Sequence, residues 1–143
     1  MIQTIHGTVE ENWIDSNGHV NISVYTKLLD MSLENLSAMH NSINSLLPDN
    51  ISFVVARILT VHISEMRFPC DWSINAGIFE INSKGFKSYH ELVNGDRRVA
   101  KFYVLCNFFS LKQRKSYEIH SSRVDNFSFA TVKGILDPFN PTL

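Results

Sequence analysis

The chain has 143 residues, a length typical of one domain, and its 44% hydrophobic and 19% charged residues are ordinary for a globular protein. The formal net charge of −1 excludes the strongly basic surface that nucleic-acid binding needs. No apolar run approaches the roughly 20 residues that cross a membrane, and the first residues do not form a signal peptide, so we expect one cytoplasmic domain over residues 1–143.

The first third of the chain predicts a strand, a polar corner and a long helix. Residues 2–10 suit a short strand, and residues 12–21 form the polar corner. From Ile22 onward, apolar side chains recur at steps of three and four residues over about seven turns. Pro48 stops this pattern. We therefore predict one long helix over residues 22–47, with an apolar stripe wide enough to be largely buried.

The rest of the chain is rich in β-branched and aromatic residues between turn signals. Lys84-Gly85 and Asn94-Gly95 are typical of tight turns between antiparallel strands. The four strands that we expect in this part of the chain cover residues 53–68, 73–82, 86–93 and 98–111. A short strand is expected at 116–120, and the tail, residues 124–143, has no assigned structure.

One helix against one antiparallel sheet is an α+β arrangement. The strand at 98–111 is apolar on both faces, and the chain offers no second long helix to cover the other face or an edge of the sheet. We therefore expect a second copy of the chain to cover it. Cys70 and Cys106 lie in no CxxC pair and near no histidine at metal-binding spacing. We expect two buried free thiols rather than a disulfide or a metal site.

The polar corner crowds a carboxylate, two amides and an imidazole into Asp15-Ser-Asn-Gly-His-Val-Asn21, just before the predicted helix. Such residues are ordinary helix N-caps, so a purely structural role is one interpretation. The other interpretation is a catalytic corner, in which the helix start offers free N–H groups and a partial positive charge to a substrate oxygen. Both interpretations place these residues at the entry to the helix.

The order of these elements, together with Asp15-x-x-Gly18-His19-Val20-Asn21 and then Tyr25, resembles the hot-dog fold acyl-CoA thioesterases. The resemblance implies an α+β hot-dog fold, with one long central helix wrapped by a curved antiparallel sheet. Ile22 stands where that family commonly has a second Asn. The resemblance extends more weakly through most of the chain, and only the tail has no clear counterpart.

The resemblance implies hydrolysis of an acyl-CoA thioester, with CoA as part of the substrate and with no cofactor or metal. Asp15 would be the nucleophile or the general base, and His19 and Asn17 would act beside it. The residues that would contact the substrate are Gly18, Val20, Asn21, Tyr25 and Glu65. Lys84 and Lys87 would bind the CoA phosphates, since the chain has no Gly-rich phosphate loop.

A subgroup that acts on betainyl-CoA is similar in further positions, which here are Trp13, Glu65, Lys87, His90 and Glu91. The main alternative to hydrolysis is a non-catalytic acyl-CoA binding or sensing hot-dog protein, which would not need Asp15 beside the thioester. A hot-dog dehydratase or hydratase and a structural dimerisation module fit the polar corner less well. The resemblance further implies a homodimer, which in this family often pairs again into a tetramer, and no nucleic-acid or membrane partner.

Overall fold

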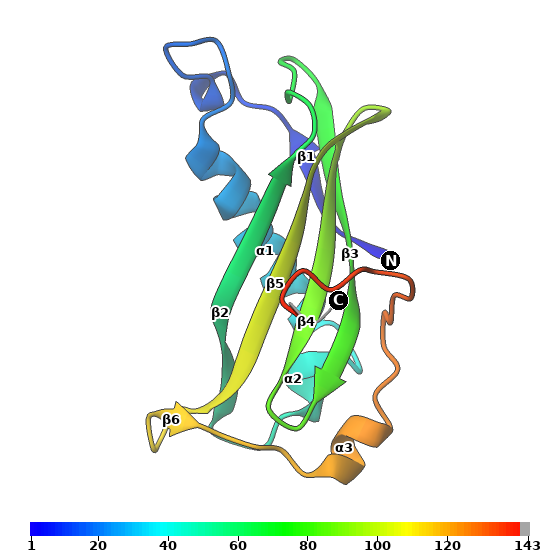
Figure 1. Cartoon of the computed structure of the whole chain (residues 1–143). Coiled ribbons are helices and arrows are strands. Elements are labelled where there is room, and N and C mark those ends of the chain that lie inside the picture. The colour runs from blue at the N-terminus through cyan, green and yellow to red at the C-terminus, as the bar shows by residue number, and fades with distance from the viewer. Residues whose placement is uncertain (141–143) are drawn as a thin grey trace.

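The structure, a computed structural model, describes residues 1–140 and shows a curved antiparallel sheet wrapped around one long helix (Figure 1). The sheet runs in the order β1-β3-β4-β5-β2, and β6 pairs with β5. Its strands are β1 (Ile2–Thr8), β2 (Ile51–His62), β3 (Asp71–Asn82), β4 (Gly85–Asn94), β5 (Arg97–Ser110) and β6 (Lys115–Ser116). The helical elements are η1 (Glu11–Trp13), α1 (Ile22–Ala38), α2 (Ile43–Leu46) and α3 (Ser121–Asp125).

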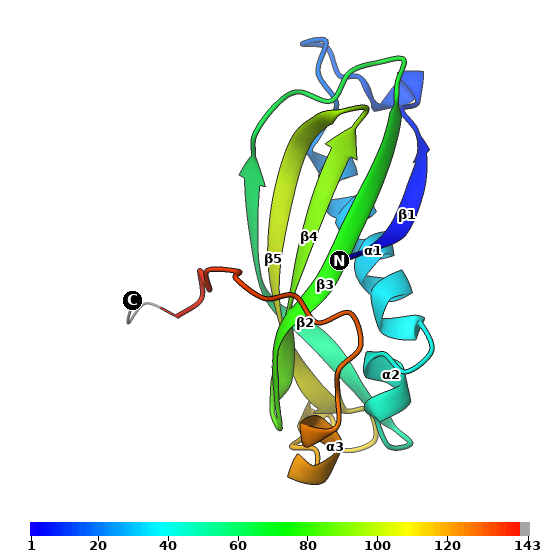
Figure 2. The ribbon, with the colours of Figure 1, turned by 90° about the vertical axis from the view of Figure 1, so that its right-hand side faces the viewer.

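Helix α1 lies across one face of the sheet, which we call the inner face (Figure 2). It buries its apolar stripe there, as its sequence predicts. Alternate residues of β5 belong to the same core, and Phe102, Val104 and Phe108 are at most 1% exposed. Full burial of one such side chain stabilises the fold by about 1.5–3 kcal/mol. The single helix against the curved sheet confirms the predicted hot-dog fold.

The prediction of one helix over residues 22–47 is wrong at its end, because α1 stops at Ala38. Met39 is extended and Asn41 is left-handed, with φ of 64°. Asn41 and Ser42 are short polar residues that favour turns over helix. The apolar pattern of the sequence continues past this break, because Ile43 is also fully buried in the core. Ile43 begins the separate short helix α2.

The expected strands are confirmed in number and order, but two of their ends differ. The strand expected over 53–68 is β2, which ends at His62, where the N–H groups of Ile63 and Ser64 both donate to the Val99 carbonyl. The strand expected at 116–120 is reduced to β6. The tail contains the short helix α3, and its last residues, 141–143, lie outside the described part of the chain.

Both cysteines are free, as expected, but only one of them is buried. Cys106 lies in the core, where burial raises the pKa of its thiol to about 12. Cys70 is half-buried instead, because it lies in the irregular segment between β2 and β3.

A chain of buried hydrogen bonds ties α1 to the sheet. Ser32 Oγ of α1 lies 2.6 Å from Thr4 Oγ1 and 2.7 Å from His90 Nδ1, and His90 Nε2 lies 2.9 Å from Ser88 Oγ. The Thr4 hydroxyl donates its one hydrogen to the Ile74 carbonyl, at 3.2 Å. Ser32 must therefore donate to Thr4, Nδ1–H of His90 must donate to Ser32, and Ser88 must donate to Nε2. With these directions every hydroxyl and ring nitrogen in this chain of hydrogen bonds has a partner, and the imidazole must be neutral.

The C-terminal segment, residues 128–140, crosses the outer face of the sheet, and we call it the strap (Figures 1 and 2). It docks on the edge of β3, where Ile78 N donates to the Ala130 carbonyl and Val132 N donates to the Ile78 carbonyl, both at 2.8 Å. This approach requires Gly77, because a Cβ there would lie 2.0 Å from Val132 Cγ2.

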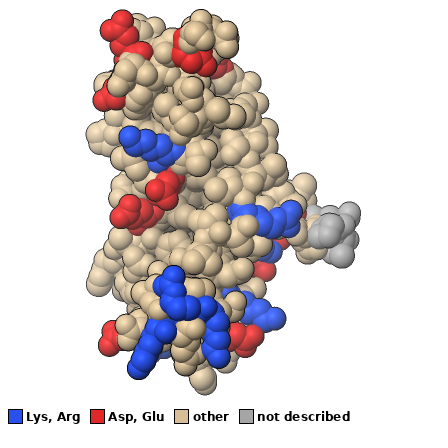
Figure 3. Space-filling model, turned by 90° about the vertical axis from the view of Figure 1, so that its left-hand side faces the viewer, with Lys and Arg blue, Asp and Glu red and all other residues tan. Residues whose placement is uncertain are grey.

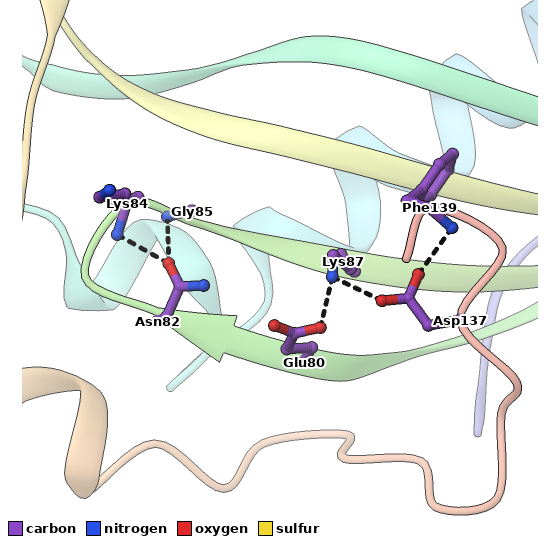
Figure 4. Close-up of polar contacts among 7 residues, drawn as sticks. All are labelled: Glu80, Asn82, Lys84, Gly85, Lys87, Asp137 and Phe139. Atoms are coloured by element: carbon purple, nitrogen blue, oxygen red, sulfur yellow. Dashed lines mark hydrogen bonds and ion pairs between the residues drawn. The ribbon is translucent and has the colours of Figure 1, made fainter. Parts of the chain in front are cut away.

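The far end of the strap is held by charge. Lys87 Nζ on β4 lies 2.6 Å from Asp137 and 2.5 Å from Glu80 (Figure 4). Burial alone would lower the pKa of Lys87, but the hydrogen bonds and charges of these two carboxylates outweigh it and raise that pKa. The Phe139 ring lies 5.1 Å from the guanidinium of Arg57 on β2. The strap therefore spans the sheet from β3 to β2.

The buried imidazole predicts a loss of stability in mild acid. Burial lowers the pKa of His90 to about 3, whereas a histidine in an unfolded chain titrates near pH 6.5. The unfolded state therefore binds more protons between these values, and stability is fully present only above pH 6.5. We expect the free energy of unfolding in urea to fall by about 2 kcal/mol from pH 7.5 to pH 5. The His40→Gln variant, changed at an exposed histidine, should show the same fall, and a flat profile would contradict a neutral buried His90.

A side chain at position 77 should displace the strap. We expect Gly77→Ala to lower the free energy of unfolding by about 1–3 kcal/mol, as overpacking does. Trypsin should also cleave the exposed Lys133 faster. Ser73→Ala, on the same face of β3, is the matched control, because it removes an atom and should leave the cleavage rate unchanged. Equal cleavage of Gly77→Ala and the wild type would show that the strap is not held at Gly77.

Candidate functional site

The polar corner folds into a tight loop closed by a β-bridge between Ile14 and Val20. Asp15 N donates to the His19 carbonyl at 2.7 Å, and Gly18 N donates to the Asp15 carbonyl at 3.0 Å. Gly18 has φ of 77°, a left-handed conformation that glycine adopts without strain. The glycine thus lets the chain turn back sharply between the carboxylate and the imidazole of the corner.

The carboxylate of Asp15 holds this loop together. Its Oδ1 accepts hydrogen bonds from the backbone N–H groups of Asn17, at 2.9 Å, and His19, at 3.2 Å. These two bonds fix the orientation of the carboxylate. Asp15 is therefore a structural residue of the loop whether or not it also takes part in chemistry.

Asn21 begins the long helix. Its Oδ1 accepts from Ser23 N at 2.9 Å and from Ser23 Oγ at 2.8 Å, which makes it the N-cap of α1. Its own backbone N donates to the Trp13 carbonyl at 2.8 Å. Ile22 then supplies the first N–H group of the helix, at the positive end of the helix dipole. The structural interpretation of Asn21 is therefore confirmed.

A hollow of about 370 Å³ lies between the start of α1 and the end of β2, and we call it the site hollow. The residues that line it are His19, Val20, Ile22, Tyr25, His62, Ile63, Ser64 and Glu65. His19 Nδ1 lies 2.7 Å from Glu65 Oε1, and both side chains are more than half exposed. The Tyr25 ring stands edge-on to His62, with ring centroids 4.9 Å apart. The site hollow is thus amphipathic, with the His19–Glu65 contact among its lining residues.

Tyr25 enters the site hollow from the buried side of α1. Burial raises the pKa of its hydroxyl, and the charge of Glu65 adds to this, while a hydrogen bond with the backbone of Met66 works in the opposite direction. The hydroxyl therefore keeps its proton at neutral pH, and Tyr25 can donate a hydrogen bond to a ligand but cannot act as a base there.

The structure brings the predicted site residues together in two groups. His19, Val20, Tyr25 and Glu65 line the site hollow, whereas Asp15, Asn17, Gly18 and Asn21 build the loop and cap beside it. Four lining residues were not predicted: Ile22, His62, Ile63 and Ser64. Three of these follow directly from the end of β2, and only the long-range packing of β2 against the start of α1 places them here.

The predicted CoA ligands lie far from the site hollow of their own chain. Lys84 is exposed in the β3–β4 turn, at the end of the sheet opposite the corner loop (Figures 1 and 4). The neighbouring Gly85 pairs with Asn107, whereas His62 pairs with Ala100, which puts the two ends about 23 Å apart along β5. Lys87 faces the outer side, where it holds the strap. Either lysine could serve only a site that belongs to another copy of the chain.

Other hollows lie elsewhere on the described part of the molecule, and two of them are compared with the site hollow in turn. One, of about 540 Å³, lies on the other side of the first turns of α1, and Trp13, Trp72, Glu10 and Lys27 are among its lining residues. The other, of about 420 Å³, lies between α2 and α3 and includes Arg123. Neither is lined by a residue of Asp15–Asn21, although Asn12 and Trp13 of the polar corner line the larger one. His19 and Val20 line the site hollow, so it is the one that borders the predicted catalytic residues.

Metal and membrane signals are missing from the described residues. Within residues 1–140, no group of three or more His, Cys, Asp or Glu side chains is placed to hold a metal ion. In the same part of the chain, no helix is both long and apolar enough to cross a bilayer.

Comparison with known proteins agrees with this geometry. Residues 9–127 match the family model of the thioesterase-like superfamily. No curated protein matches the chain by sequence. The match includes the corner loop, α1 and the strands β2 to β5. It leaves out β1 and stops just before the strap.

Several solved structures share the fold. A probable thioesterase from Escherichia coli superposes with a TM-score of 0.76 at 17% identity, over 89% of this chain and 98% of that chain. A predicted thioesterase from Bacillus stearothermophilus gives 0.75 at 15% identity, over 93% and 98%. A Staphylococcus aureus protein in complex with CoA gives 0.72 at 14% identity, over 96% and 92%. At such low identity these likenesses establish the fold alone.

Proposed function

The chain belongs to the thioesterase-like superfamily, and from this premise we propose that it hydrolyses the thioester bond of an acyl-CoA to a free acid and CoA. The observation that carries the proposal is the juxtaposition at the start of α1. A carboxylate, a helix N-terminus and the His19–Glu65 pair lie together beside a hollow. Each of these groups has a role in thioester hydrolysis, and Asp15 has the central one.

Asp15 is the nucleophile, which would give a mixed anhydride, or the general base that activates water. Its two backbone hydrogen bonds through Oδ1 support either role, because they hold the carboxylate in one orientation before substrate arrives. Asn17, on the same loop, lies close enough in sequence to orient the carboxylate or a water molecule.

The carbonyl oxygen of the thioester would be stabilised by the start of α1. The first N–H group of the helix, at Ile22, and the helix dipole favour negative charge there. Loss of one such donor typically costs about 3–4 kcal/mol of transition-state stabilisation. Because this donor is a backbone group, Ile22 in place of a second Asn removes a side-chain amide but leaves the N–H group in place.

His19 would assist the leaving group. The contact of Nδ1 with Glu65 orients the ring and leaves Nε2 as the atom that would donate a proton to the departing sulfur. As the C–S bond breaks, the electron pair goes to sulfur and His19 supplies the proton. In the general-base route Asp15 takes a proton from the attacking water, and transfer of a proton from Asp15 through solvent to His19 restores both groups. In the nucleophile route water hydrolyses the mixed anhydride in a second step. Gly18, Val20, Asn21 and Tyr25 would shape the surroundings of the acyl group.

The acyl group is less well defined by the structure. The aromatic rings of Trp13 and Trp72, 6.1 Å apart, could face a quaternary ammonium such as that of betainyl-CoA, and Glu10 lines the same hollow. The positive charge of Lys27, which lines the same hollow, would repel a cationic acyl group. His90, another residue of the betainyl-CoA resemblance, is buried in the core. Betainyl-CoA therefore stays a prediction from sequence.

A non-catalytic acyl-CoA sensor is the second candidate, and one observation favours it. Asp15 lies outside the lining of the site hollow and already serves the loop through Oδ1. A binding protein could use the same loop without any attack on the thioester.

The Asp15→Asn variant separates these functions. Asn keeps an oxygen that can accept both backbone hydrogen bonds, so the loop should stay folded and CoA binding should stay unchanged. The release of free thiol from acyl-CoA should fall by about 10²- to 10⁴-fold, the usual contribution of an acid–base group. Asp30→Asn, an exposed aspartate on α1, is the matched control. Undiminished hydrolysis by Asp15→Asn would remove Asp15 from the chemistry, and CoA binding without any hydrolysis by the wild type would favour the sensor.

We further propose that the chain forms a homodimer through β2. This strand is one of the two edges of the sheet, and its apolar side chains Val54, Val55, Ile58 and Leu59 are 40–45% exposed. A long apolar edge strand invites pairing with another strand. Two identical strands pair antiparallel about a two-fold axis that closes the assembly.

A charge at this edge should give a monomer. In Ile58→Lys the two-fold axis would bring both new ammonium groups into an apolar contact, so we expect sedimentation velocity to show monomers where the wild type shows dimers. Met31→Lys, which places the same charge on the exposed side of α1, should remain dimeric. A monomeric wild type, or an Ile58→Lys variant that stays dimeric, would contradict pairing through β2.

A further inference from the structure

The hollow between α2 and α3, which we call the α2–α3 hollow, takes no part in the proposed hydrolysis (Figure 2). Its volume of about 420 Å³ is typical of small-molecule pockets. Its walls come from residues 41–46 and residues 123–129, two segments far apart in the sequence. A hydrogen bond from the Arg123 guanidinium to the Leu46 carbonyl, at 2.9 Å, joins the two walls.

Ser42 gives this hollow a buried hydroxyl that the fold does not use. Ser42 lines the hollow and is fully buried, and its Oγ has no hydrogen-bond partner within the described residues. It stands at the start of α2, where a serine side chain usually caps the helix, yet it forms no cap hydrogen bond. A buried hydroxyl without a partner destabilises a fold. A polar ligand in the hollow would supply that partner.

Two further side chains of the hollow have donors to spare. Ser45 Oγ accepts a hydrogen bond from Asn41 N at 3.1 Å, which leaves its own hydroxyl hydrogen for another acceptor. The Arg123 guanidinium has five N–H groups and gives one of its hydrogen bonds to the Leu46 carbonyl. Within residues 1–140, no carboxylate forms an ion pair with Arg123.

The charges around the α2–α3 hollow favour an anion. Among the residues that line it, Arg123 is the one charged residue, and the exposed Asp125 of α3 does not line it. Figure 3 shows basic side chains gathered at the lower end of the molecule, the end that holds α3 and β6 in Figure 1. Lys112, Arg114 and Lys115 are exposed at β6 and the turn before it. Their positive charges add to that of Arg123 and attract an anion to this end.

The rest of the lining is apolar. Leu46, Phe127 and Phe129 line the hollow and pack, half-buried, against the core, so the core holds them in place. The α2–α3 hollow thus combines a cation and hydroxyl donors with apolar side chains. A complementary ligand has an acidic group and an apolar body.

The α2–α3 hollow is separate from the site hollow of its own chain. Helix α2 comes before β2, which starts at Ile51, whereas the site hollow lies at the other end of that strand, after His62. A strand of this length spans roughly 37 Å. Helix α3 packs against β3, away from the β2 edge of the sheet. Two different ligands could therefore occupy the two hollows together.

We propose that the α2–α3 hollow binds a small organic anion, which carries a carboxylate or phosphate group on an apolar body. Arg123 and the hydroxyls of Ser42 and Ser45 donate to the acidic oxygens. A guanidinium can hold two such oxygens with parallel hydrogen bonds, and these charge-assisted bonds are strong. Phe127 and Phe129 contact the apolar body. This binding does not depend on thioester hydrolysis, so either proposal can fail alone.

Backbone amide shifts with benzoate, phenyl phosphate and benzamide test the binding directly. We expect saturable shifts in residues 41–46 and 123–129 with at least one of the two anions, and the tighter of the two identifies the acidic group. Benzamide has the same ring without the charge and should not saturate these residues. Equal binding of benzamide, or no saturable shift in these residues with either anion, would overturn the proposal.

The Arg123→Gln variant tests the cation. Glutamine can still donate to the Leu46 carbonyl, so the two walls should stay joined. We expect the Kd for the tighter anion to rise about 10-fold or more, because a charge-assisted hydrogen bond is lost. Arg114→Gln is the matched control, because Arg114 is exposed at the same end but does not line the hollow. Its Kd should change less than about twofold. Equal Kd values for Arg123→Gln and the wild type would exclude Arg123 from the site.

The Ser42→Ala variant separates a ligand role from a structural role. Without ligand, the urea midpoint should stay the same or rise, because the change removes a buried hydroxyl that has no partner. The Kd for the tighter anion should rise by about 2- to 10-fold, as expected for one neutral hydrogen bond. A lower urea midpoint would show that the hydroxyl serves the fold, and an unchanged Kd would exclude it from the site.

Discussion

One helix of 17 residues has to cover the inner face of the whole sheet, and it is too narrow to do so. A helix is about 10 Å wide, whereas strands lie about 4.8 Å apart, so α1 shields two or three strands at once. It lies mainly against β1, β3 and β4, and it leaves the middle of β2 uncovered. The inward-facing Val55 and Ile58 therefore stay more than 40% exposed. The open edge and the site hollow at one end of it follow from this shortage of cover, which is also the reason for the proposed second copy.

In the proposed function, the residues that build the corner loop would also carry the chemistry. Asn21 must cap α1, and Asp15 must close the loop that delivers the chain to that cap. The same bonds orient the carboxylate and expose the first N–H group of the helix next to the site hollow. Capping and catalysis do not compete here, because a thioester oxygen would occupy the side of the helix start that the caps leave free.

Local patterns in the sequence predicted the elements of the fold and the corner, since periodicity, turn residues and caps act over a few positions. The end of α1 was missed because Ile43 keeps the helical period across a break made by Asn41. His62 and Ser64 were missed because only the packing of β2 against α1 places them at the site hollow. Lys87 was predicted at the CoA, yet it anchors the strap, whose tertiary contacts involve residues far along the chain. The strap itself lies beyond the family match and had no sequence signal.

The position of the thioester is the central claim, and backbone amide shifts with a non-hydrolysable thioether analogue of an acyl-CoA test it directly. The account predicts that the largest shifts fall on residues 19–25 and 62–65, around the site hollow. Shifts centred on the hollow beside Arg123, or on the one beside Trp13 and Trp72, would contradict it.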